Sequence, residues 1–528
     1  MSARGASCLF CVLAPCAAQV PAHAVLLNPS GRAYEPRFAV SGDTVHACGV
    51  TPSFPAGFIH YARSDDGGAT WPVREQVIAY TTEFDDIAAD GDLVVALVNS
   101  AYFGPHTITS RDGGHTWSVP VRVSQQSAYH QLTGARVLVH GTAVVVAWYE
   151  ERAAGRAFLN RSADGGATWL PIDVRLDVGA AFGALNPYFN QMLLCADWPV
   201  LNVLWDHVAP SGFTALAQRS TDGGATWLPA AAPLAMGKLR GVSGAGATIV
   251  AVGEPAPTVL RSADAGATFQ ASTGHGLTMP QQVAVNGSIV VAAGNVATSG
   301  VGVQVNVSGD GGVTWPLPPQ MFSFGTRVVV GEPHVAPGAC LLRCQFFDPA
   351  GPSGLLFQSD DLGVTWRQLP GEAGVRVDAG VDRVLVATHT LSTSPSTWVY
   401  VAAGHTPLGA GTTGTGGAVP RLEGRGLPAL GRSFRLEVTG ARPLGLGAFA
   451  TSFAPPAPVP LGAATLYAGQ PIVPVVFATD AAGAGALQVA VPASPAFVGL
   501  VLTSQAFVLD AGAAGGFSST RALRTWID

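Results

Sequence analysis

Polar side chains recur at one place in eight successive stretches of the chain, each time a few residues before a glycine turn. They are Arg37, Asp86, Arg136, Gln191, Arg240, Gln282, Arg327 and Arg376. If these stretches surround a common axis, five guanidinium groups and one carboxylate line its mouth and favour anionic or hydroxyl-rich ligands. The alternative is that each arginine pairs with a neighbouring carboxylate or carbonyl, with Asp85, Asp86 and Asp378 as partners.

Seven further aspartates lie within a repeated octet of the form S-x-D-x-G-x-T-W, in which Phe269 replaces the tryptophan once. They are Asp66, Asp112, Asp164, Asp222, Asp264, Asp310 and Asp361. A carboxylate can act as a general acid or base, but this spacing indicates a hairpin turn. The aspartate can accept hydrogen bonds from the turn's own N–H groups, and the glycine suits a positive φ. The octets are therefore predicted to be structural rather than catalytic.

The elements that position both sets are short strands. Between octets, as in residues 136–169, an apolar strand, a turn at Gly141, a stronger strand, a loop and a strand into the octet follow one another. Four strands per unit are typical of a propeller blade. A further unit without an octet follows the last one, and residues 24–27 could supply its missing strand. This count favours eight blades, with seven as the alternative.

The octet resembles the Asp-box (BNR) repeat of sialidases and of many non-catalytic β-propellers. The resemblance implies an all-β propeller over about three quarters of the chain. It also implies a test for catalysis, because a sialidase-like site needs three arginines around the substrate carboxylate, a carboxylic acid, and a tyrosine nucleophile beside a glutamate.

Those catalytic groups are only partly evident. Arg37 matches the first arginine of such a site in position, but no Asp or Glu occurs between residues 50 and 61, where the acid is expected. Asp86 is a candidate acid, with Tyr34 or Tyr149 as nucleophile and Glu150 beside it. The sequence therefore favours a non-catalytic protein over a sialidase-like glycoside hydrolase.

Composition and termini indicate export. Only 12% of the 528 residues are charged and the net charge is −6, without a run of Lys or Arg, which argues against nucleic-acid binding.

Residues 1–24 resemble a signal peptide ending at Ala22-His23-Ala24, and a lipoprotein anchored on Cys16 is the alternative. No later segment reaches the ~20 apolar residues of a membrane span. Cys340 and Cys344 could pair only across a bend.

The repeats end near Gly404, so residues 25–404 are assigned to the propeller and residues 405–421 to a flexible Gly/Thr-rich linker. Residues 422–528 alternate apolar and polar side chains in short runs, which predicts a small C-terminal β-sandwich. This module is similar to C-terminal modules of secreted planctomycete-like bacterial proteins through residues 502–506 and Asp510.

The sequence therefore predicts a secreted, cell-surface or periplasmic propeller that binds glycans or proteins. A degenerate sialidase-like exo-glycosidase and a scaffold of an extracellular assembly are the alternatives. No histidine or cysteine set has metal-ligand spacing, and no cofactor is expected.

Overall fold

The structure is a computed structural model of the chain. It describes residues 25–29, 36–41, 44–51, 57–65, 67–68, 70–80, 83–100, 104–125, 132–150, 156–176, 193–209, 212–227, 232–255, 258–296, 302–324, 329–336, 339–348, 351–359, 361–368, 376–379, 383–390, 396–425, 428, 433–492, 494–497 and 500–527. Within this part of the chain no helix is long and apolar enough to cross a membrane.

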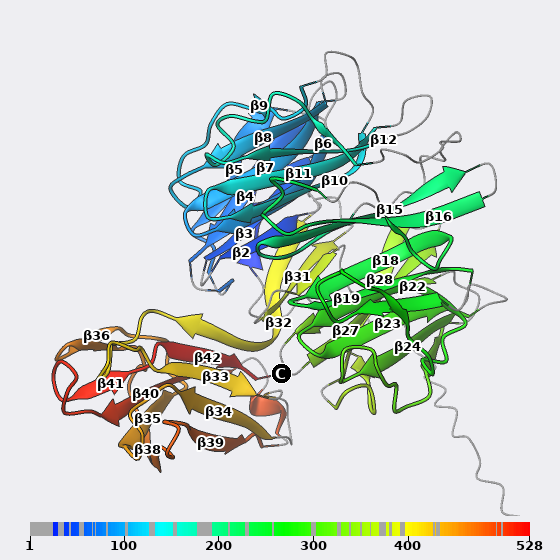
Figure 1. Cartoon of the computed structure of the whole chain (residues 1–528). Coiled ribbons are helices and arrows are strands. Elements are labelled where there is room, and N and C mark those ends of the chain that lie inside the picture. The colour runs from blue at the N-terminus through cyan, green and yellow to red at the C-terminus, as the bar shows by residue number, and fades with distance from the viewer. Residues whose placement is uncertain are drawn as a thin grey trace, which may run out of the picture.

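Seven antiparallel sheets of four strands each follow one another along the chain (Figure 1). The first three are β2 (Arg37–Ser41), β3 (Thr44–Thr51), β4 (Phe58–Ser64) and β5 (Val73–Tyr80); β6 (Glu83–Asp90), β7 (Leu93–Ser100), β8 (Gly104–Ser110) and β9 (Val121–Arg122); and β10 (Leu132–His140), β11 (Ala143–Glu150), β12 (Arg156–Ser162) and β13 (Val174–Arg175).

The next four sheets repeat this order. They are β14 (Leu193–Asp197), β15 (Val200–Ala209), β16 (Gly212–Ser220) and β17 (Ala232–Pro233); β18 (Lys238–Ala245), β19 (Thr248–Glu254), β20 (Thr258–Ser262) and β21 (Gln270–Ala271); β22 (Met279–Asn286), β23 (Ile289–Asn295), β24 (Gly302–Ser308) and β25 (Gln320–Ser323); and β26 (Val329–Ala336), β27 (Ala339–Asp348), β28 (Gly351–Ser359) and β29 (Arg367–Gln368).

An eighth group closes the series. It contains β30 (Arg376–Ala379), β31 (Arg383–Thr390) and β32 (Ser396–Leu408), and β1 (Val25–Leu26) from the start of the described chain pairs with β32. The first strands touch their neighbours in a closed cycle: β2, β6, β10, β14, β18, β22, β26, β30 and again β2. This arrangement is a β-propeller, and the strand expected at residues 24–27 joins its last group.

The second strand of each sheet is apolar on both faces because it packs against two neighbouring sheets. In β7, Val95 lies in one core with Val144, whereas the next residue in the strand, Val94, lies in another core with Ile59. Full burial of such a side chain contributes about 1.5–3 kcal/mol. Because successive side chains of a strand point to opposite faces, every sheet depends on a neighbour on each side.

The octet turns are closed by one repeated set of hydrogen bonds. In the fourth sheet, Ser220 Oγ donates to Asp222 Oδ1 (2.8 Å), and Thr226 donates through its N–H to Oδ1 (2.8 Å) and through Oγ1 to Oδ2 (2.6 Å). The N–H of Gly224 donates to Ser220 Oγ (2.9 Å), and Gly224 has φ +83°. The same bonds recur around Asp112, Asp164, Asp264, Asp310 and Asp361. Asp66 lies outside the described residues.

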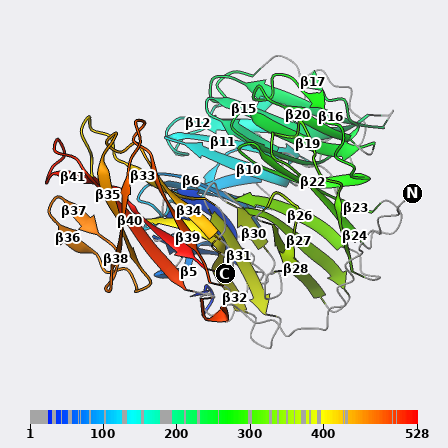
Figure 2. The same ribbon diagram turned by 90° about the horizontal axis from the view of Figure 1, so that it is seen from below.

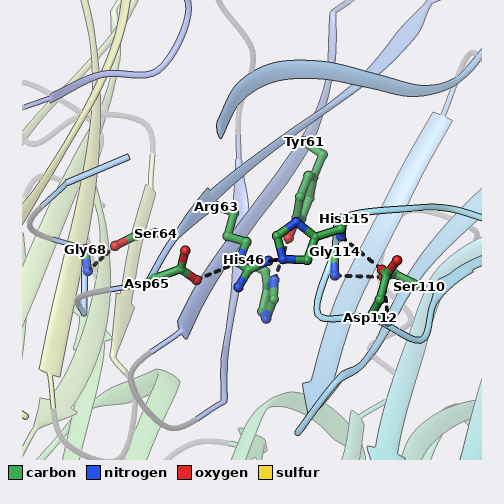
Figure 3. A network of polar contacts seen from close by, with 10 residues as sticks. All are labelled: His46, Tyr61, Arg63, Ser64, Asp65, Gly68, Ser110, Asp112, Gly114 and His115. Carbon is green, nitrogen blue, oxygen red and sulfur yellow. Dashed lines mark hydrogen bonds and ion pairs between the residues drawn. The ribbon is translucent and has the colours of Figure 1, made fainter. Parts of the chain in front are cut away.

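Arginines tie several octets to the preceding sheet. Arg63 donates to Asp65 Oδ1 (2.6 Å) in its own octet and reaches His115 Nε2 (2.5 Å) in the next one, as Figure 3 shows. Arg111 donates to the Gly165 carbonyl (3.1 Å), Arg219 to that of Ala265 (3.0 Å) and Arg261 to that of Gly311 (3.1 Å). These bonds connect the third strand of one sheet, or for Arg111 its octet turn, with the outer turn of the next sheet.

The C-terminal module is a two-sheet sandwich. One sheet is β33 (Arg421–Arg425), β34 (Ser433–Thr439) and β39 (Gly485–Ala490); the other contains β42 (Ala522–Trp526), β40 (Val501–Leu509), β35 (Leu446–Ser452) and β38 (Val473–Ala478), with β41 (Phe517–Ser519) beside β40. The hairpin β36 (Val459–Leu461) and β37 (Ala464–Leu466) and a 3-10 turn at Pro495–Phe497 complete it. A core that includes Phe434, Leu436, Phe449 and Val508 lies between the sheets.

The expected linker differs from the structure. Strand β32 continues past Gly404 to Leu408 and pairs there with β42, so one sheet runs from the propeller into the sandwich (Figure 1). Figure 2 shows the sandwich beside the propeller in a view from below. Beyond β32, Thr412 bridges to Ser519, and the N–H of Thr415 donates to Asp510 Oδ2 (2.7 Å). Residues 405–421 are thus held by backbone pairing and a carboxylate.

Cys48, Cys340 and Cys344 are free, buried thiols; of Cys195 the structure describes only the backbone, on β14. Cys340 and Cys344 lie on the same strand, β27, paired with Val335 and Gly331. Burial raises the pKa of the Cys340 thiol to about 12, so these thiols act as small apolar side chains.

We expect Asp222→Ala to lower the free energy of unfolding by about 1–3 kcal/mol, because the turn donors lose their charged acceptor. Thr221→Ala is the matched control, since Thr221 is exposed in the same turn and makes no hydrogen bond found among the described residues. Urea unfolding of both variants measures the effect. Equal stability of the two variants would contradict the structural role of the carboxylate.

Acid should weaken these turns. Hydrogen bonds from Thr226 lower the pKa of Asp222 from 3.8 to about 2, and threonines do the same for Asp164, Asp264 and Asp310. A folded-state pKa below the unfolded value stabilises the fold above pH 3.8, and this contribution is lost as the pH falls to about 2. The difference in Tm between the protein and Asp222→Asn should therefore narrow from pH 4 to pH 2. A constant difference would refute the assignment.

Candidate functional site

Strand pairing fixes which residues occupy equivalent places near the axis. In each first strand one residue pairs with the residue eleven positions later in the second strand, as Arg37 pairs with Cys48. These residues are Arg37, Asp86, Arg136, Leu193, Gly241, Gln282, Glu332 and Arg376. The structure thus keeps five of the residues aligned in the sequence, and it places Leu193, Gly241 and Glu332 where the alignment placed Gln191, Arg240 and Arg327.

Two of the three differences have a local cause in the described strands. Arg240 is the extra residue of a β-bulge, because the pairing of β18 with β19 shifts between Leu239 and Gly241. Gly331, four residues after Arg327, lies inside β26 opposite Cys344, and the pairing of β26 with β27 continues to Ala336 and Ala339. Arg327 and Gln191 lie outside the described residues.

Charged residues at these places gather on one side of the ring. They are Glu332, Arg376, Arg37, Asp86 and Arg136, which lie on β26, β30, β2, β6 and β10, five first strands that are consecutive in the cycle. The places on β14, β18 and β22 hold Leu193, Gly241 and Gln282. The ring therefore has a charged sector instead of a uniform positive mouth.

Several of these side chains contact neighbours. Asp86 Oδ2 accepts the N–H of Val137 from the next sheet (3.3 Å), and Arg136 donates to the carbonyl of Ala135 (2.9 Å). Arg240 pairs with Glu254, with Nε and Oε1 3.0 Å apart, and Arg343 pairs with Glu332. Asp86, the acid candidate from sequence, thus has a structural bond between two sheets.

The carboxylate beside it is placed differently. Asp85 is the extra residue of a bulge, since Phe84 pairs with Val98 and Asp86 pairs with Leu97. Its Oδ2 atom is buried and has no hydrogen-bond partner among the described residues. On the same strand, Glu83 accepts a hydrogen bond from Asn99 Nδ2 (2.8 Å). We call Arg37, Glu83, Asp85, Asp86 and Arg136 the charged cluster.

Burial raises the pKa of the Asp85 carboxyl to about 7; Arg136 and Arg37 oppose this rise, and Glu83 and Asp86 add to it. A carboxyl group with this pKa is present in both protonation states near neutral pH, so it can donate or accept a hydrogen bond. The cluster can therefore offer guanidinium donors, carboxylate acceptors and one group of either kind.

Other candidates from the sequence are outside the described structure. Tyr34 is among them, as are the side chains of Tyr149, Glu150, Arg376 and Asp378, whose backbones lie on β11 and β30. Sequence reasoning considered Asp85 only as a partner of an arginine. Nothing in the local sequence marks the bulge that distinguishes it from Asp86.

The cluster lacks the composition of a metal centre. Within the described ranges, no group of three or more His, Cys, Asp or Glu residues could hold a metal ion. The described octet carboxylates are engaged by hydrogen bonds within their own turns, whereas the charged cluster can take part in hydrogen bonding and proton transfer.

The comparisons with known proteins bear only on the fold of this chain. No family model matches the sequence, and no curated protein matches it. Among solved structures, YCF48 bound to a D1 peptide matches at 16% identity over 60% of this chain and 91% of that chain, with a TM-score of 0.39. The β-propeller domain of the Trilobed protease from Pyrococcus furiosus matches at 8% identity over 66% and 96%, with a TM-score of 0.37.

A sialidase from Trypanosoma rangeli in complex with 2,3-difluorosialic acid matches at 11% identity over 86% of this chain and 92% of that chain, with a TM-score of 0.31. Likenesses of this extent carry no information on the activity of this chain.

We expect Asp85→Asn to stabilise the protein at pH 8. A pKa raised from 3.8 to about 7 means that the fold loses stability as the pH rises through this interval, with an upper limit of about 4 kcal/mol. The variant cannot ionise, so its gain in free energy of unfolding should be about 1–3 kcal/mol at pH 8 and should vanish below pH 4. Urea unfolding at both pH values measures it, with Asp92→Asn, exposed in the following turn, as control. A loss of stability at pH 8 would contradict the assignment.

Proposed function

We propose that this chain is an exported, non-catalytic propeller of the Asp-box type that binds an acidic glycan through the charged cluster, with the C-terminal sandwich as an accessory module. The observation that carries the proposal is the position of Asp85: its buried Oδ2 atom has no hydrogen-bond partner among the described residues, and two arginines and two further carboxylates act on its carboxyl group.

The location of the cluster supports a ligand site. It draws on three adjacent first strands, β2, β6 and β10, in a cyclic arrangement where the first strands lie nearest the axis. Arg37, Asp85, Asp86 and Arg136 are partly exposed and Glu83 is exposed. Polar groups that converge at the mouth of a ring are typical of ligand sites in propellers and barrels.

Its charge supports a ligand with both a carboxylate and hydroxyl groups. The guanidinium groups of Arg37 and Arg136 can bind a carboxylate through paired hydrogen bonds, and Arg376 lies on the next first strand. Glu83, Asp85 and Asp86 can accept hydrogen bonds from sugar hydroxyls. An acidic glycan matches both sets, whereas a simple anion would leave the carboxylates without donors.

Two further elements of the proposal concern the whole chain. Residues 1–24 are proposed to direct export and to be removed, so that the secreted or cell-surface protein begins near Val25.

The eight groups of strands are proposed to be eight blades rather than seven, since the first strands of all eight lie in one cycle.

A sialidase-like exo-glycosidase is the second candidate, and one observation favours it. Asp85 has the raised pKa that suits a general acid near neutral pH, and arginines flank it on both sides of the cluster. Hydrolysis of a fluorogenic sialoside by the protein, and its loss in Asp85→Asn, would establish this activity in place of simple binding.

The binding proposal is tested on an array of acidic and neutral glycans with the chain from Val25, followed by titration of the best ligand. Arg136→Gln should weaken binding at least tenfold, because hydrogen bonds to charged groups contribute about 1.5–3 kcal/mol. Asp85→Asn should weaken binding while it stabilises the fold, a combination expected of a functional carboxylate rather than a structural one.

Arg435→Gln is the matched control, since Arg435 is an exposed arginine of the sandwich. Unchanged affinity in Arg136→Gln, or an equal loss in the control, would overturn the assignment of the site. Binding of neutral glycans alone would overturn the acidic ligand, and failure to bind any glycan would favour a protein partner.

A further inference from the structure

One aromatic side chain of the first sheet is largely exposed to solvent. Of the aromatic side chains that the structure describes, Tyr80 at the end of β5 has the largest exposed fraction, 74%. The described octet aromatics are buried or half-buried, for example Trp71 and Trp315. A tyrosine ring is large and rigid, which suits it to contact with a ligand.

Two further rings support that of Tyr80. Tyr80 pairs with Phe58 across β5 and β4, and their ring centroids lie 5.3 Å apart at an interplanar angle of 62°. Phe58 also contacts His60 on the same face of β4, with centroids 6.2 Å apart, and His60 is buried. The ring of Tyr80 is therefore held in place before a ligand arrives. We call Tyr80 and Phe58 the aromatic pair.

Strand register places the aromatic pair at the same end of the ring as the charged cluster. Arg37 of β2 pairs with Cys48 of β3, and Cys48 pairs with Tyr61 of β4. Phe58 precedes Tyr61 by three residues, and β4 runs parallel to β2 because both are antiparallel to β3. Phe58 and Tyr80 therefore lie beyond Arg37, at the end of the sheet where β2 begins.

The charged cluster also starts at this end, on the second sheet. Strand β6 begins with Glu83, and two residues separate Glu83 from Tyr80. The Cα atoms of Glu83 and Tyr80 are therefore at most ~11 Å apart. Ala79 and Phe84, which flank them, pack in one core. The aromatic pair is thus fixed close to the exposed edge of the charged cluster.

We propose that the aromatic pair stacks a second sugar of the acidic glycan whose acidic sugar occupies the charged cluster. The inference rests on the function proposed above, and it specifies the ligand as an acidic sugar joined to a neutral pyranose. The distance between Tyr80 and Glu83 is one that a disaccharide can span.

The chemistry of a pyranose suits both parts of the site. Its C–H groups form an apolar face, and its hydroxyl groups lie around the edge. The C–H groups pack on the face of the tyrosine ring, which carries the negative part of the ring quadrupole. Hydroxyl groups at the edge remain within reach of acceptors such as Glu83. Since neither Tyr80 nor Phe58 is charged, a neutral sugar fits this position.

Calorimetric titration of the chain from Val25 tests the proposal with two matched pairs of probes. One pair is glucuronic acid and its disaccharide with glucose, cellobiouronic acid. The other pair is N-acetylneuraminic acid and its disaccharide with galactose. In the pair that binds, the disaccharide should bind about fivefold more tightly than the monosaccharide, or better. The two pairs distinguish a uronic acid from a sialic acid as the acidic sugar.

Variants of Tyr80 assign this gain in affinity. Tyr80→Ala should abolish the gain, whereas Tyr80→Phe should keep most of it, because stacking uses the face of the ring rather than the hydroxyl group. Phe453→Ala is the matched control, since Phe453 is an exposed aromatic residue of the C-terminal sandwich, and it should keep the full gain. Melting curves show that each variant is folded.

Arg136→Gln separates this proposal from the function on which it rests, because it should weaken the monosaccharide and the disaccharide alike. A gain that persists in Tyr80→Ala, while Arg136→Gln still weakens binding, would overturn stacking on the aromatic pair and leave the charged cluster as the whole site. Loss of the gain in Tyr80→Phe would assign it to the hydroxyl group and also overturn stacking. Absence of binding by all four probes would overturn the acidic-glycan site together with its extension.

Discussion

Mutual burial of neighbouring sheets is the constraint on which the rest of the propeller depends. Successive residues of one strand, such as Val94 and Val95, belong to cores on opposite sides of their sheet. A single sheet would therefore expose one apolar face or both, and only a series that returns to its start covers every face. Pairing of β1 with β32 and the contact between β2 and β30 complete that return.

The octet turns serve this constraint at the outer edge. Their hydrogen bonds are local, since Asp222 is bonded by residues within four positions of it, so the pattern can be recognised in the sequence. The bonds from arginines that connect one octet to the next sheet, such as that from Arg219 to Ala265, cannot be recognised in the same way. They join residues about fifty positions apart, and neither segment contains a sequence pattern that identifies its partner.

The same distinction explains how much of the site could be predicted. The strands, the turns and the closing strand at Val25 follow from local pattern, and Arg37, Asp86 and Arg136 were aligned as the structure aligns them. A bulge displaces Arg240, and the glycine that follows Arg327 marks close packing rather than a turn. A Cβ at Gly331 would lie 2.5 Å from Val303, so this glycine lets two sheets approach. Likewise, a Cβ at Gly411 would lie 2.5 Å from the Ser519 carbonyl, within a segment whose composition indicates a flexible linker.

Bulges are the feature that local pattern could not supply, and they have the largest chemical effect. The extra residue is Asp85 in β6 and Arg240 in β18. Each bulge therefore adds a charged residue that has no partner in the regular strand pairing. A ring held together by apolar faces gains nothing from a carboxyl group whose burial opposes its ionisation, and apolar replacements of similar volume are often more stable. Asp85 has this property, since the arginines of the neighbouring first strands only partly oppose the effect of its burial. Because the repeated sheets and turns supply stability many times over, the propeller can retain such a group on its ring, and retention against a stability cost is what a chemical role for it would require.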